Sequence, residues 1–318
     1  MLFGREVDII GQDEPYNYRN RMDFVITKNK LGLKANFHTV VDIDCCEILI
    51  NPLNVLLKKI RSWVQKHDLE GCSPGTFDGY LRFVMLRGDN NQQQVTLTTT
   101  SDENRELIKE LYESLQVTSL VWTIEQEQSE ESVGSVHEVF GQEHILLSLA
   151  GKSFRISSHT FFQTSPHMAS QAINTIKKFV DTTEVFDLYC GVGVMGQCVS
   201  EQVIGVDNNS DNILQARKNA QLNGVQAEYV CADASQALRD SSPELVIVDP
   251  PRTGLQSAVH TLMAAAPRRI IYLSCNPKTQ ARDLLALQSV YEVTYLQAFD
   301  FFAHTDHIEC LAVLDKKR

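Results

Sequence analysis

The feature that most constrains the fold begins near Phe154, where short apolar runs start to alternate with amphipathic stretches. Uninterrupted runs such as Leu245 to Val248 and Ile270 to Leu273 are typical of strands that are covered on both faces. Between the runs lie helical patterns such as Asp211 to Leu222, which is followed by Gly224. This alternation predicts an α/β fold with a doubly wound, mostly parallel sheet.

The first half of the chain has a different pattern. It contains short β-rich runs and two helical patterns, around Val55 to Gln65 and Asn104 to Leu115. A chain of 318 residues is long enough for about two domains. We therefore expect an α+β domain at residues 1–150 and the α/β domain at residues 151–318. The polar, acidic segment Glu125 to Gly134 is predicted to be an exposed loop.

The charge is distributed unevenly. The formal net charge is −11, and residues 102–143 alone hold 2 basic and 11 acidic residues. By contrast, residues 19–34 hold five basic residues and one acidic residue. An acidic chain is not a general polyanion binder, but a basic face on one domain could hold a specific nucleic acid. A solvated strand pair of mixed charge explains the same residues equally well.

The longest apolar runs are far shorter than the roughly 20 residues of a membrane helix, and the N-terminus has no apolar block of signal-peptide length. We therefore expect a cytoplasmic protein that has no membrane partner. The eight cysteines include no C-x-x-C pair, which argues against a zinc ribbon or a thioredoxin-like site. His304 and His307 have no third convergent ligand in the sequence, so no metal site is predicted.

A glycine-rich turn follows the first strand of the α/β domain. Gly191, Gly193 and Gly196 match G-x-G-x-x-G, a weak signal that dinucleotide-binding folds and methyltransferases share. Asp187 at the end of this strand would repel a pyrophosphate and attract an ammonium group, so S-adenosylmethionine (SAM) is favoured over a nicotinamide dinucleotide. Asp207 ends the next strand, where it could bind both ribose hydroxyls or serve as a helix-cap or turn residue.

Three more segments are expected at the carboxyl edge of the sheet, where open α/β folds bind their ligands. They are D-P-P-R at 249–252, S-C-N-P at 274–277 and the turn before Glu309. Cys275 thus differs in position from the other seven cysteines. The runs Val293 to Gln297 and Cys310 to Leu314 have no room for a crossover helix between them, so we expect them to pair antiparallel.

These residues resemble the SAM-dependent RNA uracil-5-methyltransferases that act on transfer RNA and 23S ribosomal RNA. The resemblance runs from Phe154 to Leu314, and Tyr16 to Arg21 is similar to the motif that opens the family's central domain. The segments F-F-Q-T-S-P and H-T-D-H place the chain nearer the ribosomal RNA branch. The matching segments are F-F-Q at 161–163, D-L-Y-C-G-V-G at 187–193, D-P-P-R, S-C-N-P and F-D-F-F-A-H-T-D-H-I-E at 299–309.

The resemblance implies a Rossmann-like class I methyltransferase sheet with an N-terminal α+β RNA-binding lobe. It also implies an enzyme that methylates carbon 5 of a uridine in structured RNA, with ribosomal RNA favoured over transfer RNA. A thiolate that adds to carbon 6 would make carbon 5 an enolate nucleophile, and a base would later remove the carbon 5 proton. Cys275 takes the first role and Glu309 the second. Arg252 could supply the positive field that ionises the thiol.

The remaining site residues follow from the same comparison. Three of the site residues have alternative structural roles. Cys275 could be a core thiol, Glu309 a surface acid and Phe162 a core ring. Asp207 stands where the family usually has glutamate, which shortens its reach by one methylene. We expect SAM contacts from Gln163, Asp187, Tyr189, Gly191, Gly193, Asp207 and Asp249. We expect RNA contacts from Phe162, Arg252, Asn276, Arg19 and Arg21.

Many members of the family hold an iron–sulfur cluster on four cysteines. Cys46 resembles the fourth of these, but no cysteine precedes Cys45, so no cluster is predicted. The chain also starts too late to include the small β-barrel that some members carry. We therefore expect either a compact variant or a shortened gene product. RNA contact would then fall on residues 19–34 and the cleft of a monomer. The rival functions are a non-catalytic RNA-binding relic and an NAD-dependent dehydrogenase.

Overall fold

A computed structural model describes residues 7–28, 30–36, 38–73, 78–127, 132–238 and 243–318. It divides into a C-terminal unit (Met1–Pro15, Ser148–Arg155 and Thr160–Arg318) and an N-terminal unit (Tyr16–Leu147 and Ile156–His159). The division differs from the predicted boundary at residue 150 mainly at the start of the chain. There, β1 (Ile9–Ile10) pairs in parallel with β16 (Tyr291–Phe299) and so belongs to the C-terminal unit.

The C-terminal unit contains an eight-stranded sheet in the order β1-β16-β17-β15-β14-β11-β12-β13. Strands β11 to β15 are parallel, whereas β17 runs antiparallel to both β15 and β16, as the sequence predicts for the last two strands. The order reverses between β11 and β14, which creates a topological switch point. The bounds are β11 Glu184–Leu188, β12 Gln202–Asp207, β13 Gln226–Cys231, β14 Leu245–Val248, β15 Arg269–Ser274 and β17 Glu309–Lys316.

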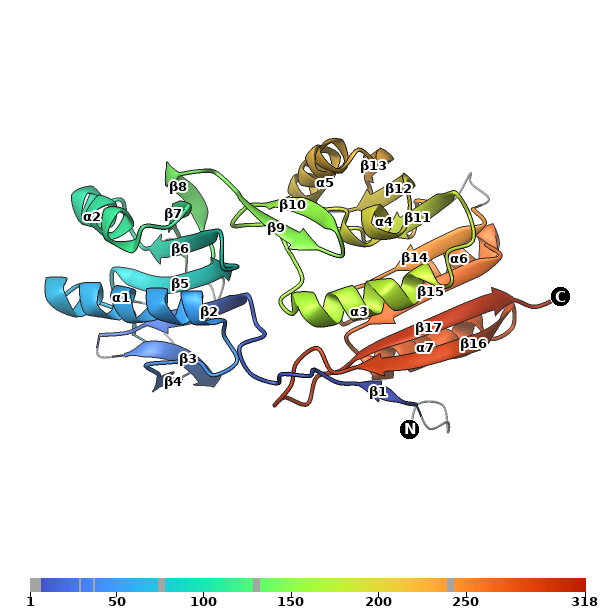
Figure 1. Cartoon of the computed structure of the whole chain (residues 1–318), viewed down its shortest axis with the longest axis horizontal. Coiled ribbons are helices and arrows are strands. Elements are labelled where there is room, and N and C mark those ends of the chain that lie inside the picture. The colour runs from blue at the N-terminus through green and yellow to red at the C-terminus, as the bar shows by residue number, and fades with distance from the viewer. Residues whose placement is uncertain (1–6, 29, 37, 74–77, 128–131, 239–242) are drawn as a thin grey trace. The chain divides into compact units, whose positions relative to one another are not determined.

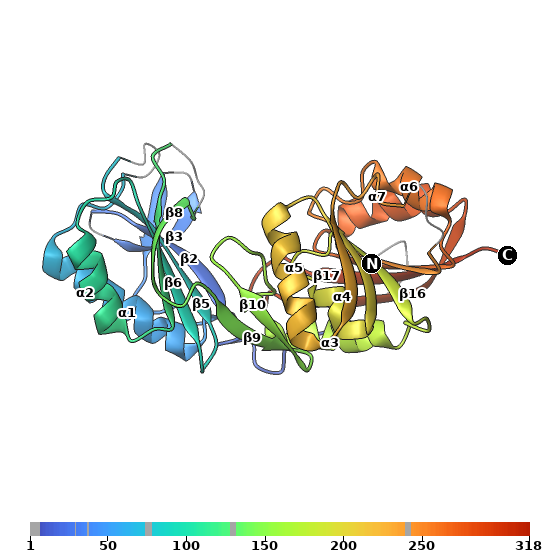
Figure 2. The same cartoon turned by 90° about the horizontal axis from the view of Figure 1, so that it is seen from above.

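Helices cover both faces of this sheet, with α6 and α7 on one face and α3, α4 and α5 on the other (Figures 1 and 2). Val246 and Val248 in β14 pack in one cluster with Leu262 of α6 and Leu284 of α7. Because these strands are buried on both faces, they read as continuous apolar runs in the sequence. The bounds are α3 Pro166–Lys177, α4 Val194–Val199, α5 Ser210–Asn223, α6 Ala258–Ala265 and α7 Pro277–Leu287.

The N-terminal unit contains a seven-stranded sheet in the order β4-β3-β2-β5-β6-β7-β8. Only β6 and β7 pair in parallel, and α2 connects them. The two-stranded sheet of β9 (Ile145–Leu149) and β10 (Lys152–Ile156) is separate. The bounds are β2 Arg21–Ile26, β3 Leu31–Asn36, β4 Thr39–Asp42, α1 Asn51–His67, β5 Leu81–Gly88, β6 Gln93–Thr99, α2 Arg105–Leu115, β7 Ser119–Ile124 and β8 Ser135–Gly141.

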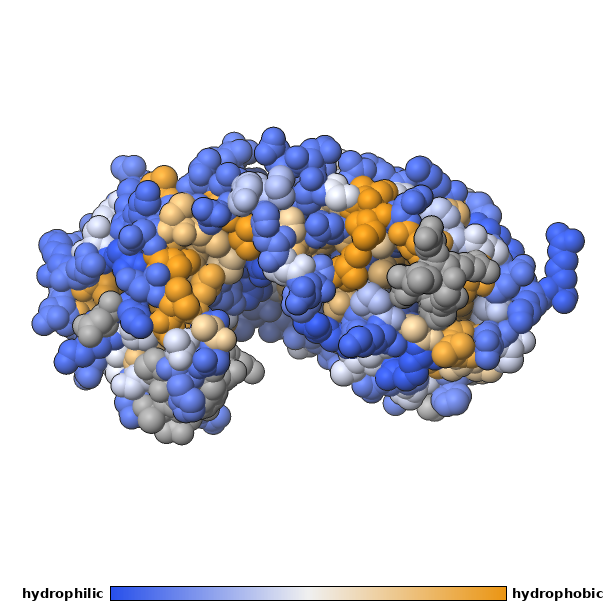
Figure 3. Space-filling model, turned by 90° about the horizontal axis from the view of Figure 1, so that it is seen from below, coloured by the Kyte–Doolittle hydropathy of each residue, from blue (hydrophilic) through white to orange (hydrophobic). Residues whose placement is uncertain are grey.

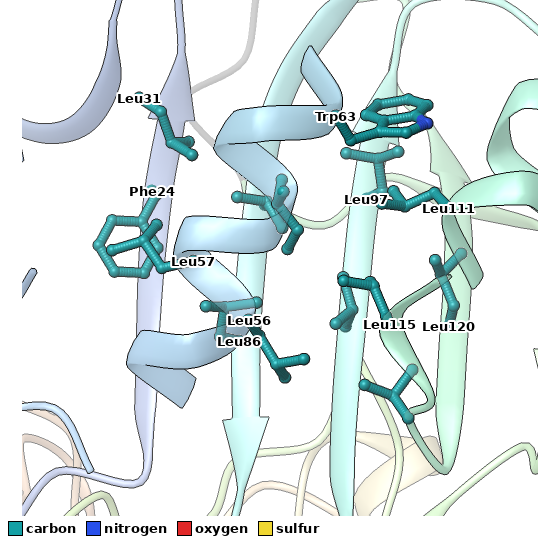
Figure 4. Packing of buried hydrophobic residues seen from close by; sticks show 14 of the residues in the cluster. Phe24, Leu31, Leu56, Leu57, Trp63, Leu86, Leu97, Leu111, Leu115 and Leu120 are labelled. Carbon is teal, nitrogen blue, oxygen red and sulfur yellow. The ribbon is translucent and has the colours of Figure 1, made fainter. Parts of the chain in front are cut away.

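Helices α1 and α2 pack on one face of this sheet. Leu57 and Trp63 of α1 lie against Phe24 of β2 and Leu97 of β6 in a single hydrophobic cluster (Figure 4). Each such side chain contributes about 1.5–3 kcal/mol when it is fully buried. The acidic segment predicted as an exposed loop follows β7, and its residues 128–131 lie outside the described part of the chain.

The described helices include none with the length and apolar character needed to cross a bilayer. On the face drawn in Figure 3, hydrophobic residues form separate patches among hydrophilic ones. In the ranges that the structure describes, no group of three or more His, Cys, Asp or Glu residues is arranged to hold a metal ion.

Candidate active site

The strand ends of the C-terminal sheet bring three reactive side chains to one edge. Asp249 follows β14 and Cys275 follows β15, and these two strands are parallel neighbours. Glu309 begins β17, which runs in the opposite direction and so starts at the edge where β15 ends. This edge flanks the switch point, the usual place for a ligand in an open α/β sheet.

The same three side chains share one face of the sheet. Val248, Tyr272 and Ala312 belong to the hydrophobic cluster with α6 and α7. Successive residues of a strand point to opposite faces. The alternation therefore turns Asp249, Cys275 and Glu309 toward the opposite face.

The register of β15 and β17 brings Cys275 and Glu309 together. Ser274 pairs with Cys310 as the last printed pair of this antiparallel ladder. Cys275 follows Ser274 in a bend just beyond the ladder, and Glu309 precedes Cys310, so both lie at the same end of this strand pair. The Glu309 carboxylate acts electrostatically on the Cys275 thiol. The thiol and the carboxyl group are thus neighbours, although they are far apart in the chain.

The charges at this edge are mostly negative. Burial, and then the neighbouring carboxylates of Glu309 and Asp249, raise the pKa of the Cys275 thiol to about 11, while Arg252 opposes them. Burial and the Asp249 carboxylate raise the pKa of Glu309 well above its ordinary value. Burial also raises the pKa of Asp249 to about 7, although part of its surface is exposed. A cation bound here would relieve the repulsion and favour the ionised thiol and carboxylates.

Arg252 is the cation that lowers the pKa values of Cys275 and Glu309. Hydrogen bonds to the backbone of Arg252 hold its loop in place. Its carbonyl oxygen accepts hydrogen bonds from Asn276 Nδ2 at 2.9 Å and from Thr279 Oγ1 at 3.1 Å. Its guanidinium Nη2 lies 3.4 Å from His307 Nδ1. The D-P-P-R loop is therefore fastened to the S-C-N-P segment that carries the thiol.

Two glycines of the glycine-rich turn differ in the space around them, and only Gly191 has open space beside its backbone. Gly191 has φ +54°, and a Cβ atom added to it would meet no atom within 4 Å. Gly193 has φ +83°, and a Cβ atom there would lie 2.4 Å from Gln197 Nε2 and 2.5 Å from the Tyr229 hydroxyl. Tyr189 also has a positive φ of 63°, a rare conformation for a bulky residue that is found at functional turns. A ligand can therefore approach the backbone closely at Gly191.

The two acids at the strand ends hold this turn. Asp207 Oδ2 accepts a hydrogen bond from Gly191 N at 2.9 Å, and its Oδ1 accepts one from Asn209 N at 2.9 Å. Asp187 is completely buried, and its Oδ2 accepts a hydrogen bond from Gly196 N at 2.8 Å. The other oxygen of Asp187 has no partner among the described residues, and burial raises the pKa of this carboxyl group to about 7. This unpartnered oxygen suits a cationic ligand by its charge. Because Asp187 is completely buried, however, the oxygen is not exposed at the surface of the turn.

Several predicted substrate contacts have other roles in the structure. Phe162 is only 2% exposed and lies 5.9 Å from the ring of Phe154, so its expected contact with RNA is wrong for this conformation. Its neighbour Phe161 is 58% exposed and is the ring that is free to stack. Asn276 caps α7 through Lys278 N in addition to holding Arg252.

Three other predicted residues lie on other elements of the chain. Arg19 and Arg21 belong to the N-terminal unit, where Arg21 pairs with Asp23 at 2.9 Å, so part of its charge is neutralised. Gln163 is half-buried in the segment before α3.

Sequence reasoning missed the polar residues of α7 that support the site. Gln280 is fully buried, and its Nε2 donates to the carbonyl oxygens of Tyr272 and Cys310, each at 3.0 Å. Asp283 accepts hydrogen bonds from Leu255 N at 2.7 Å and from the Tyr272 hydroxyl at 2.9 Å. Both lie on the helix face of Leu284 and Leu287, and polar residues on an apolar helix face are the signal that could have revealed them.

Comparisons with known protein families agree with this architecture. A family model described as tRNA (Uracil-5-)-methyltransferase matches residues 234–317. A second model, described as Methyltransferase small domain, matches residues 157–272. Together the two matches cover the strands and turns that form the acidic edge and the glycine-rich turn.

The chain is also similar to individual proteins over almost its full length. It is 31% identical to a tRNA (uracil(54)-C(5))-methyltransferase of Pyrococcus furiosus, covering 98% of this chain and 77% of that protein. It is 31% identical to an uncharacterized RNA methyltransferase of Caldanaerobacter subterraneus, covering 95% and 73%. The first name includes tRNA and neither includes ribosomal RNA, so the predicted nearness to the 23S ribosomal RNA branch is not supported.

A solved structure extends the comparison to three dimensions. The crystal structure of Pyrococcus abyssi tRNA (uracil-54, C5)-methyltransferase in complex with S-adenosyl-L-homocysteine has a TM-score of 0.90 with this chain. The sequences are 28% identical, and the match covers 98% of this chain and 80% of that one. This similarity confirms the predicted fold class.

Proposed function

The chain belongs to the tRNA (uracil-5-)-methyltransferase family, and on that premise we propose that it methylates carbon 5 of a uridine in transfer RNA through a covalent adduct of Cys275. It is a SAM-dependent RNA uracil-5-methyltransferase. The proposed mechanism is supported by the Ser274–Cys310 pair, which brings the ends of β15 and β17 together, and by the effect of Glu309 on the Cys275 thiol. The names of the relatives favour transfer RNA over the ribosomal RNA expected from the motifs.

The methyl donor fits the acidic edge by its charge. SAM supplies an electrophilic methyl group on a positively charged sulfur. The open side of Gly191, the half-buried Asp207 carboxylate and Asp249 are the groups proposed to hold it. Its positive charge would oppose the repulsion that raises the pKa values of Cys275 and Asp249.

The first proposed step is addition of the Cys275 thiolate to carbon 6 of uracil. The new sulfur–carbon bond pushes the electron pair of the carbon 5–carbon 6 double bond toward the carbonyl oxygen at carbon 4, which gives an enolate. Carbon 5 then forms a bond to the methyl group, and the donor leaves as a neutral thioether. Arg252 is proposed to favour the thiolate, because it lowers the pKa of Cys275.

The second step releases the product. Glu309 takes the proton from carbon 5, the double bond re-forms and the Cys275 thiolate departs. A carboxylate with a raised pKa is a stronger base than an ordinary one, which suits this role. The hydrogen bonds of Gln280 to Tyr272 and Cys310 support the two strands that carry the thiol and the base.

The test uses RNA transcripts and SAM with two variants of the acidic edge. Glu309→Gln should accumulate a covalent protein–RNA adduct that carries the methyl group, and Cys275→Ser should abolish both the adduct and turnover. Cys231→Ser, a change at an exposed cysteine of the same unit, is the matched control and should behave as wild type. An adduct that persists in Cys275→Ser would refute the assigned nucleophile.

The same experiment tests the choice of RNA and the rivals. Transfer RNA and 23S ribosomal RNA transcripts are compared as substrates, and methylation of the ribosomal transcript alone would reverse the proposed preference. Calorimetry with SAM tests whether the chain is a non-catalytic RNA-binding relic, because such a relic should show no heat of SAM binding. The same calorimetry with NAD tests whether the chain is an NAD-dependent dehydrogenase, because such an enzyme should bind NAD.

A further inference from the structure

The turn between β2 and β3 in the N-terminal unit presents two lysines in a fixed arrangement. Thr27 closes the turn, since its backbone N donates to the Lys30 carbonyl at 2.8 Å and its Oγ1 accepts from Lys30 N at 3.1 Å. Lys28 and Lys30 are both exposed on this turn. These two hydrogen bonds join the residues on either side of the turn.

A cavity lies on each side of this turn. One, of about 290 Å³, is lined by the turn and by α1 with the residue that follows it, including Arg61 and Asp68. The other, of about 420 Å³, is lined by the turn together with His38 and Ser73. Thr27, Lys28 and Lys30 line both cavities.

Neither lysine of the turn forms an ion pair with a described carboxylate. The structure shows no ion pair or hydrogen bond between the Lys28 side chain and another described residue. Lys30 Nζ donates to the Val40 carbonyl at 3.1 Å, which leaves two of its three donors for a ligand. By contrast, carboxylates neutralise Arg21, Arg61, Lys66 and Arg105. Asp68 is the one carboxylate among the lining residues, so the two cavities together are positively charged.

We propose that the Lys28–Lys30 turn binds the phosphodiester backbone of the RNA substrate, with phosphates on both sides of the turn. This inference rests on the proposed function, because it names a contact surface for the same RNA. A polyanion with regularly repeated charges fits two hollows on either side of one cationic ridge better than a single small anion does. Lysine contacts to phosphate position an RNA without reading its sequence.

The turn therefore refines the sequence-based expectation for residues 19–34. Arg21 stands at the start of β2 and the lysine turn follows its end, so a strand of about 20 Å separates them. Arg21 is paired with Asp23, whereas Lys28 is not paired. Within residues 19–34, the turn therefore offers a cation that is not neutralised, whereas Arg21 does not.

The experiment compares Lys28→Ala/Lys30→Ala with a charge-matched control, Lys58→Ala/Lys109→Ala, at two exposed lysines of the same unit outside both cavities. Binding of a transfer RNA transcript is measured by fluorescence anisotropy at several salt concentrations, and turnover by methyl transfer. The turn variant should bind RNA at least tenfold more weakly, with a KM raised to match and kcat within twofold of wild type. Its slope of log K against log salt should be about one to two units shallower.

The outcomes separate this inference from the proposed function. Equal losses of RNA affinity in the turn variant and in the control would overturn the inference while methyl transfer by wild type continued. Inorganic phosphate that binds wild type but not the turn variant, with RNA affinity unchanged, would assign the turn to a free anion and would also overturn it. Failure of wild type to methylate any RNA would count against the proposed function, whereas the anisotropy would still report on the turn.

Discussion

Cys275 follows Ser274 and Glu309 precedes Cys310, so the thiol and the carboxyl group flank the Ser274–Cys310 pair that ends the antiparallel ladder of β15 and β17. The carboxylate raises the pKa of the thiol, and Arg252 lowers it. The ionisation of Cys275 therefore depends on both Glu309 and Arg252. This dependence leads to measurable effects of substitutions around the thiol.

Glu309→Gln should make Cys275 more reactive at neutral pH in the absence of ligands. The Glu309 carboxylate is one cause of the raised pKa of the thiol, so replacing it with a neutral amide should lower that pKa. The rate of Cys275 alkylation is followed against pH by mass spectrometry of its peptide, with exposed Cys45 and Cys231 replaced by serine. The midpoint should move to lower pH in the variant, and an unchanged midpoint would show that the two groups do not interact.

Thr279→Val should weaken the attachment of the D-P-P-R loop. It removes one of the two hydrogen bonds to the Arg252 carbonyl, at a cost of about 1 kcal/mol, or roughly fivefold in kcat if the loss falls on the transition state. The midpoint for Cys275 alkylation should rise, because Arg252 would favour the thiolate less. Thr279→Ser keeps the hydroxyl and should restore both values, whereas equal defects in the two variants would point to packing alone.

Gly191→Ala should reduce the affinity for SAM more than it reduces stability. The methyl group would enter open space on the side where the ligand is proposed to approach, and the positive φ would cost about 1 kcal/mol. Gly224→Ala is the matched control, since Gly224 has φ +67° with open space around it at the end of α5. Thermal unfolding should show similar losses for both, and calorimetry should show weaker SAM binding for Gly191→Ala only. Equal SAM affinities would remove Gly191 from the proposed donor site.

The stability of the C-terminal unit should fall between about pH 4 and pH 7. Burial raises the pKa of Asp187 from 3.8 to about 7, so over this range the folded state holds a proton that the unfolded state releases. The contribution is fully present below pH 4 and is lost as the pH rises through 7, at up to about 1.4 kcal/mol per pH unit. Asp187→Asn should be less sensitive to pH, so its melting temperature relative to wild type should rise from pH 5 to pH 8. Parallel melting curves would show that Asp187 does not titrate in this range.

The sequence predicted those parts of the molecule that depend on local patterns. The apolar runs of β14 and β15 and the glycine that ends α5 appear as expected, because burial on both faces and a left-handed cap leave direct traces in the residues. The mostly parallel sheet and the antiparallel pairing of the last two strands also appear as predicted, from the same runs and from the short connection between β16 and β17.

Other features depend on long-range packing and left weaker traces. The pairing of β1 with β16 depends on two residues, Ile9 and Ile10, that are too few to form a pattern. Which of two adjacent phenylalanines is buried depends on the position of the Phe154 ring. The hydrogen bonds of Gln280 and Thr279 join segments whose proximity only the folded chain reveals.

The antiparallel direction of β17 has one last consequence. Since backbone hydrogen bonds between adjacent strands set the separation of thiol and base, insertions or deletions in the intervening surface turns would leave that separation unchanged. A slip of β17 by a single residue would be far more damaging. It would bring Ile308 or Cys310 to the position that Glu309 holds near Cys275. It would also turn the Glu309 side chain toward the other face of the sheet.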